Sequence, residues 1–409
     1  MESSAIRGPL TKLRVLDLTQ YIAGPYATRL LADFGADVIK VERPGGDPAR
    51  RLGPFPGNVS HPERSGTFFY FNANKRSIVM DLRHPAASGV FGRLVDLADV
   101  VVESLRPGAL DALGLGWQFL HHRRPSVPLV SISNFGQSGP YRHYRGSETV
   151  LFGFGGEMYA TGLASREPVK MYGTAALIQA GAAASTAILA AAMVGKDQGI
   201  GQHVDFSIVE SQLGSADRRH ATLIGYAFSG RKTVRREAEA AGLADGVFPC
   251  LDGYVELHGA ARRFDRLIEM LGRPRWALSP RWQDPSAARD PQAIEEFNSH
   301  LITWLMARNK REVWKEARRA RVMCAPLFTI AEIYDDAHFR QRGFWCDVHH
   351  PELGRVTMPG RPFLMSDSPW ALRRPAPLLG EHSREILKEA GLDDEEIDAL
   401  IAAGAVESL

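Results

Sequence analysis

Short apolar strands alternate with helices through the first half of the chain, and this alternation limits the fold more than any other feature. Residues 13–42 begin with the strand LRVLDLT, continue with a helix that starts at Gly24 and Pro25, and end with the strand ADVIKVE. Strand–helix–strand units of this length form parallel sheets with right-handed crossovers. Further strands are expected at residues 76–82, 99–104 and 128–136. The pattern therefore predicts an α/β fold with a doubly wound parallel sheet.

Four parts are expected along the chain. They are a large domain in residues 1–215, a linker in 216–246, a smaller α+β domain in 247–329, and a C-terminal segment in 330–409. The linker is predicted from a polar stretch rich in glycine and alanine. Loops after the strands of the large domain would gather at one edge of its sheet, where α/β proteins bind ligands.

The charge balance and the cysteines exclude several classes of function. The 409 residues include 49 Lys and Arg and 47 Asp and Glu, which gives a formal net charge of +2. A chain so balanced offers no bulk attraction to nucleic acid or to an anionic membrane, and neither partner is expected. Its three cysteines, Cys250, Cys324 and Cys346, are far apart and form no CxxC pair, so no metal site or disulfide framework is expected.

One segment, IQAGAAASTAILAAAMV at residues 178–194, is apolar enough to suggest a membrane span. Alanine and glycine dominate it, and they contribute little transfer free energy compared with leucine or isoleucine. A buried, close-packed helix is the better interpretation. No apolar stretch of signal-peptide length precedes the first strand, so we expect a cytoplasmic protein.

A series of motifs resembles the class III CoA-transferases, the family of formyl-CoA transferase, carnitine CoA-transferase and the BaiF-like proteins. The motifs are LRVLDLTQYIAGPYATRLLADFGADVIKVERPGGDPAR, FNANKRSIVMDL, DVVVESLRPGALDALGLGW, VSISNFGQSGPY, GIGQHVDFSIVES, HFRQRGFWCDVHHPELGRVTMPGRPF and APLLGEHSREILKEAGLDDEEI. One such motif would be weak, but all of them in this order are very specific and cover nearly the whole chain. The resemblance implies an interlocked homodimer and a large domain that the C-terminal tail completes. It also implies coenzyme A as co-substrate, with acyl-CoA thioesters and carboxylic acids as substrates.

The resemblance assigns a CoA site to the strand ends, where phosphates call for cations and backbone N–H groups. The loop after the first strand matches the family's pantetheine and thioester contacts, and Gly24 would let the backbone approach the ligand closely. The CoA-binding residues that the resemblance implies are Tyr21, Ile22, Ala23, Gly24, Arg43, Lys75, Ser104, Leu105 and Arg145. Ala112 departs from the pattern, because a family member has a CoA-binding arginine there.

Class III transfer needs a carboxylate that attacks the thioester and forms a mixed anhydride. In the family this aspartate lies four residues before a glycine that begins an alanine-rich helix, and that glycine is Gly181 here. Leu177 therefore stands at the nucleophile position, and no Asp or Glu occurs between Pro168 and Gly181. The two-base pair of the racemase branch is missing too, because Ser147 replaces its histidine and Leu177 its aspartate.

Glu148 is the one carboxylate left near the predicted site. It is a candidate catalytic residue as a displaced nucleophile or base, although a role in ordering a loop through hydrogen bonds is the interpretation that we favour.

Three functional hypotheses follow. The chain is an enzyme that uses Glu148 or a non-covalent route, a silent transferase subunit whose sister chain carries the aspartate, or an acyl-CoA-binding regulatory protein. The family contains two-subunit enzymes with one degenerate chain, such as benzylsuccinate CoA-transferase, and GVFPCLDGYVEL resembles that branch. We therefore expect a CoA-transferase subunit, in a homodimer or in a heterodimer with an Asp-bearing sister.

Overall fold

The apolar strands predicted from the sequence pair into one seven-stranded sheet. They are β1 (Arg14–Leu18), β2 (Asp37–Glu42), β3 (Arg76–Met80), β4 (Val100–Glu103), β5 (Leu129–Ser133), β6 (His203–Ser207) and β12 (Val406–Glu407). Their order is β12-β3-β2-β1-β4-β5-β6, and all neighbours are parallel except β12 and β3. The winding of the chain reverses between β1 and β4, so the carboxyl ends of these two strands flank the crevice in which such sheets bind ligands.

The computed structural model describes the whole chain except residues 1–7, 215–218, 233, 236–241, 259–262 and 285. The chain divides into two units: Met1–Gly162 with Arg166–Arg235 and Gly343–Leu409, and Leu163–Ser165 with Arg236–Arg342. The predicted linker falls partly outside the described residues, and its described part includes the helix α10 (Arg219–Ser229). The predicted domain boundaries stay a prediction.

Apolar residues alternate along the central strands and build one core on each face of the sheet. In β1, Val15 packs into one core while Leu16 and Leu18 pack into the other. The first core takes residues from α1 (Ala23–Asp33), α2 (Gly66–Asn72), α6 (Glu148–Phe154), α8 (Ala175–Gln198) and α9 (Ile208–Leu213). The second takes residues from α3 (Ala87–Leu97), α4 (Ala109–Ala112), α5 (Trp117–Arg123), α16 (Ser383–Glu389) and α17 (Asp394–Ala402). Helices on both faces make this a doubly wound sheet.

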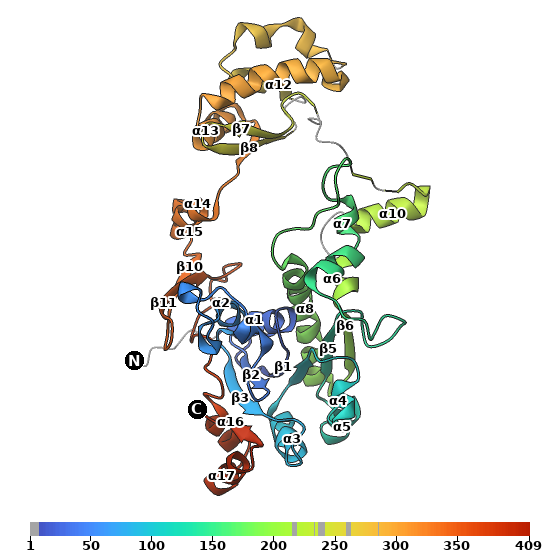
Figure 1. Ribbon diagram of the computed structural model, residues 1–409, viewed down its shortest axis with the longest axis vertical. Helices are drawn as coiled ribbons and strands as arrows, with labels where there is room; N and C mark the ends of the chain where they lie inside the picture. The colour runs from blue at the N-terminus through green and yellow to red at the C-terminus, as the bar shows by residue number, and fades with distance from the viewer. Residues whose placement is uncertain (1–7, 215–218, 233, 236–241, 259–262, 285) are drawn as a thin grey trace. The chain divides into compact units, whose positions relative to one another are not determined.

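Residues 343–409 of the C-terminal segment belong to the first unit and add its last strand. Figure 1 shows it in red beside β3, where β12 pairs antiparallel with that strand. Arg76 of β3 also forms ion pairs with Glu385 and Glu389 of α16. The unit further contains α7 (Glu157–Ala160) and a hairpin of β10 (Trp345–His350) and β11 (Gly354–Pro359). The predicted parallel-sheet domain with its C-terminal completion is therefore confirmed, and the interlocked dimer stays a prediction.

The second unit is the smaller α+β part that the sequence predicts. Its antiparallel sheet consists of β7 (Gly246–Cys250), β8 (Gly253–His258) and β9 (Met323–Pro326), in that order. Its helices are α11 (Phe264–Met270), α12 (Pro291–Met306), α13 (Lys310–Ala320), α14 (Ile330–Asp335) and α15 (Ala337–Gln341).

Helix α8 is the one described helix long and apolar enough, by length and composition, to cross a membrane. It packs against α1 and against β4, β5 and β6, and Ala180, Ala184 and Ile188 lie in the core. These contacts are those of a core helix. A Cβ atom at Gly181 would lie only 2.6 Å from the carbonyl oxygen of Ala23, so glycine allows the close approach of α8 to the start of α1.

We expect Gly181→Ala to lower the free energy of unfolding by about 1–3 kcal/mol, because the added methyl group forces the two helices apart. Gly89 of α3 is the matched control, since a Cβ there meets no atom within 4 Å. Gly89→Ala should raise stability by about 0.5–1 kcal/mol, the helix preference of alanine over glycine. Denaturant unfolding of both variants measures the two shifts, and shifts of the same sign would contradict the close approach.

Candidate functional site

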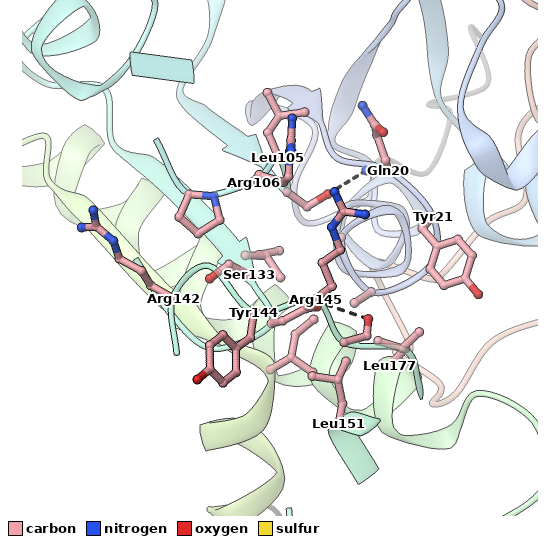
Figure 2. Close-up of a pocket in the computed structure, with 18 of the residues that line it drawn as sticks. Gln20, Tyr21, Leu105, Arg106, Ser133, Arg142, Tyr144, Arg145, Leu151 and Leu177 are labelled. Carbon is pink, nitrogen blue, oxygen red and sulfur yellow. Dashed lines mark hydrogen bonds between the residues drawn. The ribbon is translucent and has the colours of Figure 1, made fainter. Parts of the chain in front are cut away.

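A cavity of about 670 Å³ opens at the carboxyl ends of β1, β4 and β5, beside the point where the strand order reverses. Figure 2 shows the side chains that line it. They come from Gln20, Tyr21, Ala23 and Gly24 after β1, from residues 104–109 after β4, from 132–134 and 142–148 around and after the end of β5, and from Leu151, Leu177 and Ile208. This is the edge of the sheet at which the sequence predicts a ligand.

One end of the cavity is apolar. Figure 2 shows Leu151 and Leu177 together at this end, and Ile132 and Ile208 also line the cavity. Leu177 is 4% exposed and belongs to the core around α8. An alkyl side chain cannot be acylated and cannot exchange a proton. The predicted nucleophile position therefore contributes apolar surface instead of a reactive group.

Glu148 is the only carboxylate among the lining residues, and both of its oxygens already accept hydrogen bonds. The backbone N–H of Ala176 donates to Oε1 at 3.0 Å, and that of Leu177 donates to Oε2 at 3.2 Å. These N–H groups belong to the first turn of α8, whose N-cap residue Thr174 makes no side-chain capping bond. Glu148 thus caps the helix, where a negative charge is favourable. These bonds favour the interpretation of Glu148 as an ordering residue.

Three arginines, Arg106, Arg142 and Arg145, also line the cavity. Arg145 is exposed, and in Figure 2 its guanidinium points toward the loops that carry Gln20 and Leu105. The lining thus contains three arginines and a single carboxylate, which is held by a helix N-terminus, so the net charge of the cavity favours an anionic ligand. Arginine binds phosphate groups through paired hydrogen bonds.

The loops after β1 and β4 are tied together beside the cavity. The backbone N–H of Gln20 donates to the hydroxyl of Ser104 at 2.8 Å. A Cβ at Gly24 would lie 2.4 Å from Cβ of Thr19, so glycine lets the loop fold tightly before α1. The two lining loops therefore hold a fixed separation.

Glu103, at the end of β4, bonds to the backbone of the loop that follows this strand. Burial raises the pKa of its carboxyl group to about 7, although hydrogen bonds from Ser131 and from the backbone of Leu105 oppose this shift. The N–H of Leu105 donates to Oε2 at 2.6 Å. Glu103 thus positions the backbone that carries Ser104 and Leu105 into the cavity.

Lys75 lies inside the protein and not at the cavity wall. Its buried ammonium group donates to Asp17 Oδ2, to the carbonyl of Pro25 and to Asn72 Oδ1, each at 2.9 Å. All three of its protons are therefore used, and burial lowers its pKa to about 8. The prediction that this ammonium contacts CoA finds no support in these contacts, which indicate a structural role.

The cavity brings together most of the predicted residues and leaves a few outside. Its lining includes Tyr21, Ala23, Gly24, Ser104, Leu105 and Arg145 with Ser147, Glu148 and Leu177. Ile22 is 3% exposed and points into the core, and Ala112 on α4 does not line the cavity. Arg43 follows β2, where its Nε donates to the carbonyl of Gly46 at 3.2 Å.

Two arginines of the lining, Arg106 and Arg142, are not among the residues that the sequence predicts for the site. Each follows a predicted strand end, the same signal that selected Arg43 and Arg145, so this signal could have found them. Among the described residues, no group of three or more His, Cys, Asp or Glu side chains is placed to hold a metal ion.

Comparisons with known proteins agree with this architecture. The model of "CoA-transferase family III" matches residues 10–383. The chain is 33% identical to the succinyl-CoA:(R)-benzylsuccinate CoA-transferase subunit BbsE of Thauera aromatica, over 97% of this chain and 98% of that protein. It is 32% identical to a succinyl-CoA–D-citramalate CoA-transferase of Chloroflexus aurantiacus, over 98% and 99%. The crystal structure of a CAIB/BAIF family protein from Brucella suis superposes with a TM-score of 0.81 and 30% identity, covering 94% of this chain and all of that one.

We expect Glu148→Ala to lower the free energy of unfolding by about 1–3 kcal/mol, because two N–H groups at the start of α8 lose their acceptor. Glu148→Gln should lose less, since its amide oxygen still accepts one bond. Exposed Glu395 is the control, and Glu395→Ala should change stability by less than about 0.5 kcal/mol. Thermal unfolding ranks the variants.

A separate experiment tests whether Glu148 is a nucleophile. Incubation with acyl-CoA, hydroxylamine trapping and peptide mapping would find a nucleophilic Glu148 modified, and we expect it to be unmodified.

The raised pKa of Glu103 predicts a pH dependence of stability. Between the ordinary pKa of about 4.5 and the folded value of about 7, the folded protein binds more protons than the unfolded chain. The stability that comes from the preference of the folded protein for protonated Glu103 is therefore complete below pH 4.5. It is lost as the pH rises through 7, because the folded protein must then bury the ionised carboxylate. Glu103→Gln keeps an acceptor for Leu105 and removes the titration. Unfolding measured from pH 5 to 8 should show the variant gaining roughly 1–3 kcal/mol relative to wild type as pH rises, and parallel curves would contradict this origin.

Proposed function

Since the chain belongs to CoA-transferase family III, as a transferase or a subunit of one, we propose that it binds acyl-CoA in the cavity at the carboxyl ends of β1, β4 and β5. The arginines of the cavity would take the phosphates of CoA, and the apolar end with Leu151 and Leu177 would take the acyl group. Coenzyme A is then a co-substrate, and the substrates are acyl-CoA thioesters and carboxylic acids.

The second part of the proposal is that the chain is a silent subunit whose sister chain carries the catalytic aspartate. The observation that supports it most directly is Leu177, which stands at the nucleophile position while the nearby Glu148 is engaged at the start of α8. A mixed anhydride needs a carboxylate that is free to attack, and the lining of this cavity supplies none. The name of one relative, the BbsE subunit of a benzylsuccinate CoA-transferase, supports a role as a subunit.

An interlocked dimer would give a silent chain a function. In such an assembly each chain helps to complete the cleft of the other, so a subunit without a nucleophile still builds its partner's site. A homodimer that uses Glu148, or an acyl-CoA-binding protein without turnover, would be the alternative outcomes. We also propose a cytoplasmic location, which the packing of α8 in the core supports.

The binding proposal predicts a measurable affinity for CoA. Calorimetric titration should detect CoA and acyl-CoA, and Arg145→Glu should weaken binding by about 1–3 kcal/mol, the usual effect of a lost charge-assisted contact. Arg43→Glu tests the other arginine that the resemblance assigns to the CoA site, which does not line this cavity. Arg166, exposed and not part of the lining, is the control. Absence of binding at millimolar ligand would overturn the proposal, and equal losses in all three variants would show only a general charge effect.

The subunit proposal predicts that transfer activity requires co-expression with the nearest Asp-bearing relative. The chain alone should turn over acyl-CoA far more slowly than about 1 per second, an ordinary enzymatic rate. Leu177→Asp should restore some activity to the single chain, while Leu177→Asn, of the same size but unable to form an anhydride, should restore none. Ordinary turnover by the wild-type chain alone would refute the silent-subunit assignment.

A further inference from the structure

Tyr21 has an unusual backbone conformation for its residue type. Its φ is 74°, in the left-handed region, which bulky side chains adopt rarely. The residue is 41% exposed and lines the cavity, and α1 begins two residues later with Ala23 and Gly24, which line it as well. The conformation of Tyr21 therefore affects both the cavity wall and the direction in which the next residues point. Strained backbone of this kind persists only where the surroundings enforce it.

A buried ion pair contacts the backbone on both sides of Gln20. The N–H of Tyr21 donates to Asp47 Oδ1 at 3.1 Å, and Lys40 Nζ lies 2.8 Å from Asp47 Oδ2. The same ammonium donates to the carbonyl of Thr19 at 2.9 Å. Both charged side chains are 1% exposed. One ion pair thus bonds to the backbone on both sides of Gln20, which is itself bonded to Ser104.

Stability alone does not explain such a pair. Two charges lose their hydration on burial, and replacing a buried ion pair by apolar residues is often neutral or stabilising. What apolar residues would not supply is the acceptor for the N–H groups of Tyr21 and Ala49 and the donor for the Thr19 carbonyl. Neither Lys40 nor Asp47 lines the cavity, so neither contacts a ligand there.

We propose that Lys40 and Asp47 are positioning residues, whose ion pair enforces the left-handed backbone at Tyr21 and so sets the ligand-binding shape of the loop after β1. The enforcing role stands on the geometry alone, while its consequence for CoA rests on the proposed function. Two readouts, one without and one with ligand, separate these two parts.

The first readout is stability, and it uses glycine and alanine at position 21. Both remove the tyrosine ring, but only glycine adopts a positive φ without strain. With the ion pair intact, Tyr21→Gly should melt about 1–3 °C above Tyr21→Ala. Asp47→Ala alone would leave the Lys40 charge buried and unpaired, and that variant could fail to fold. The pair is therefore removed with Lys40→Met and Asp47→Ala together, and in this background the advantage of glycine should vanish because alanine relaxes to negative φ.

The second readout is CoA affinity in the same four proteins, measured by calorimetry. With the ion pair intact, the glycine and alanine variants should bind within about 3-fold of each other. Without it, the glycine variant should bind roughly 5-fold or more tightly than the alanine variant, because only glycine still reaches the bound conformation. The pair Lys310 and Glu332 in the second unit is the control, and Lys310→Met with Glu332→Gln should leave both comparisons unchanged.

The outcomes are distinct. If glycine keeps its stability advantage without the ion pair, the pair does not enforce the conformation and the inference is overturned. If the stability pattern holds but CoA affinity does not depend on the background, the ligand-positioning role is overturned. If the wild-type chain binds no CoA, the proposed function fails, while the stability comparison still decides whether the pair holds Tyr21.

Discussion

Buried charges next to the loop after β1 are the constraint on which the cavity depends. Asp17, Lys40, Asp47 and Lys75 are all buried, and they pair as Lys75 with Asp17 and Lys40 with Asp47. Most of their remaining hydrogen bonds go to the segment from Thr19 to Thr28, through the carbonyls of Thr19 and Pro25, the N–H of Tyr21 and the hydroxyl of Thr28. Lys75 also donates to Asn72, and Asp47 also accepts from the N–H of Ala49. Loss of any one partner would leave a buried charge without compensation. Two strand residues, Asp17 of β1 and Lys40 of β2, and two residues outside the strands, Asp47 and Lys75, thus supply the polar contacts that the loop cannot make with itself.

Much of the fold could be predicted because the period of apolar residues changes between strand and helix. LRVLDLT and DVVVES read as strands, and they became β1 and β4 with side chains alternating between two cores. The pairing of β12 with β3 joins residues more than 300 positions apart. No local pattern encodes such a pairing, and only the family resemblance predicted that the tail completes the domain. The conformation of Tyr21 could not be predicted either, because it results from contacts with a distant side chain and not from the propensity of tyrosine.

In the candidate site, too, local sequence patterns predicted some features, while others depend on contacts between distant residues. The positions of strand ends placed Ser104, Leu105 and Arg145 at one edge of the sheet, and they line one cavity there. Whether a cation at a strand end faces ligand or protein depends on packing, so Lys75 could not be told apart from Arg145 by position. One signal was available in the strands themselves. Asp17 and Lys40 interrupt apolar runs, and a lone charge in a buried strand needs a partner. Such a pattern of isolated charges indicates an internal ion pair from the sequence alone.

Leucine at position 177 leaves the scaffold of the site intact, and the contacts at the start of α8 explain how. The N–H groups of Ala176 and Leu177 need an acceptor whatever side chain stands at position 177, and Glu148 supplies it. The leucine side chain lies in the same core cluster as Leu151 and Ile208, so it adds no unpaired polar group. A carboxylate at this position would have to share its surroundings with Glu148, and the repulsion between the two charges would favour the protonated form of one of them. The architecture of the site is therefore independent of the side chain at position 177: the loop after β1 and the helix cap are each held by contacts that do not involve it.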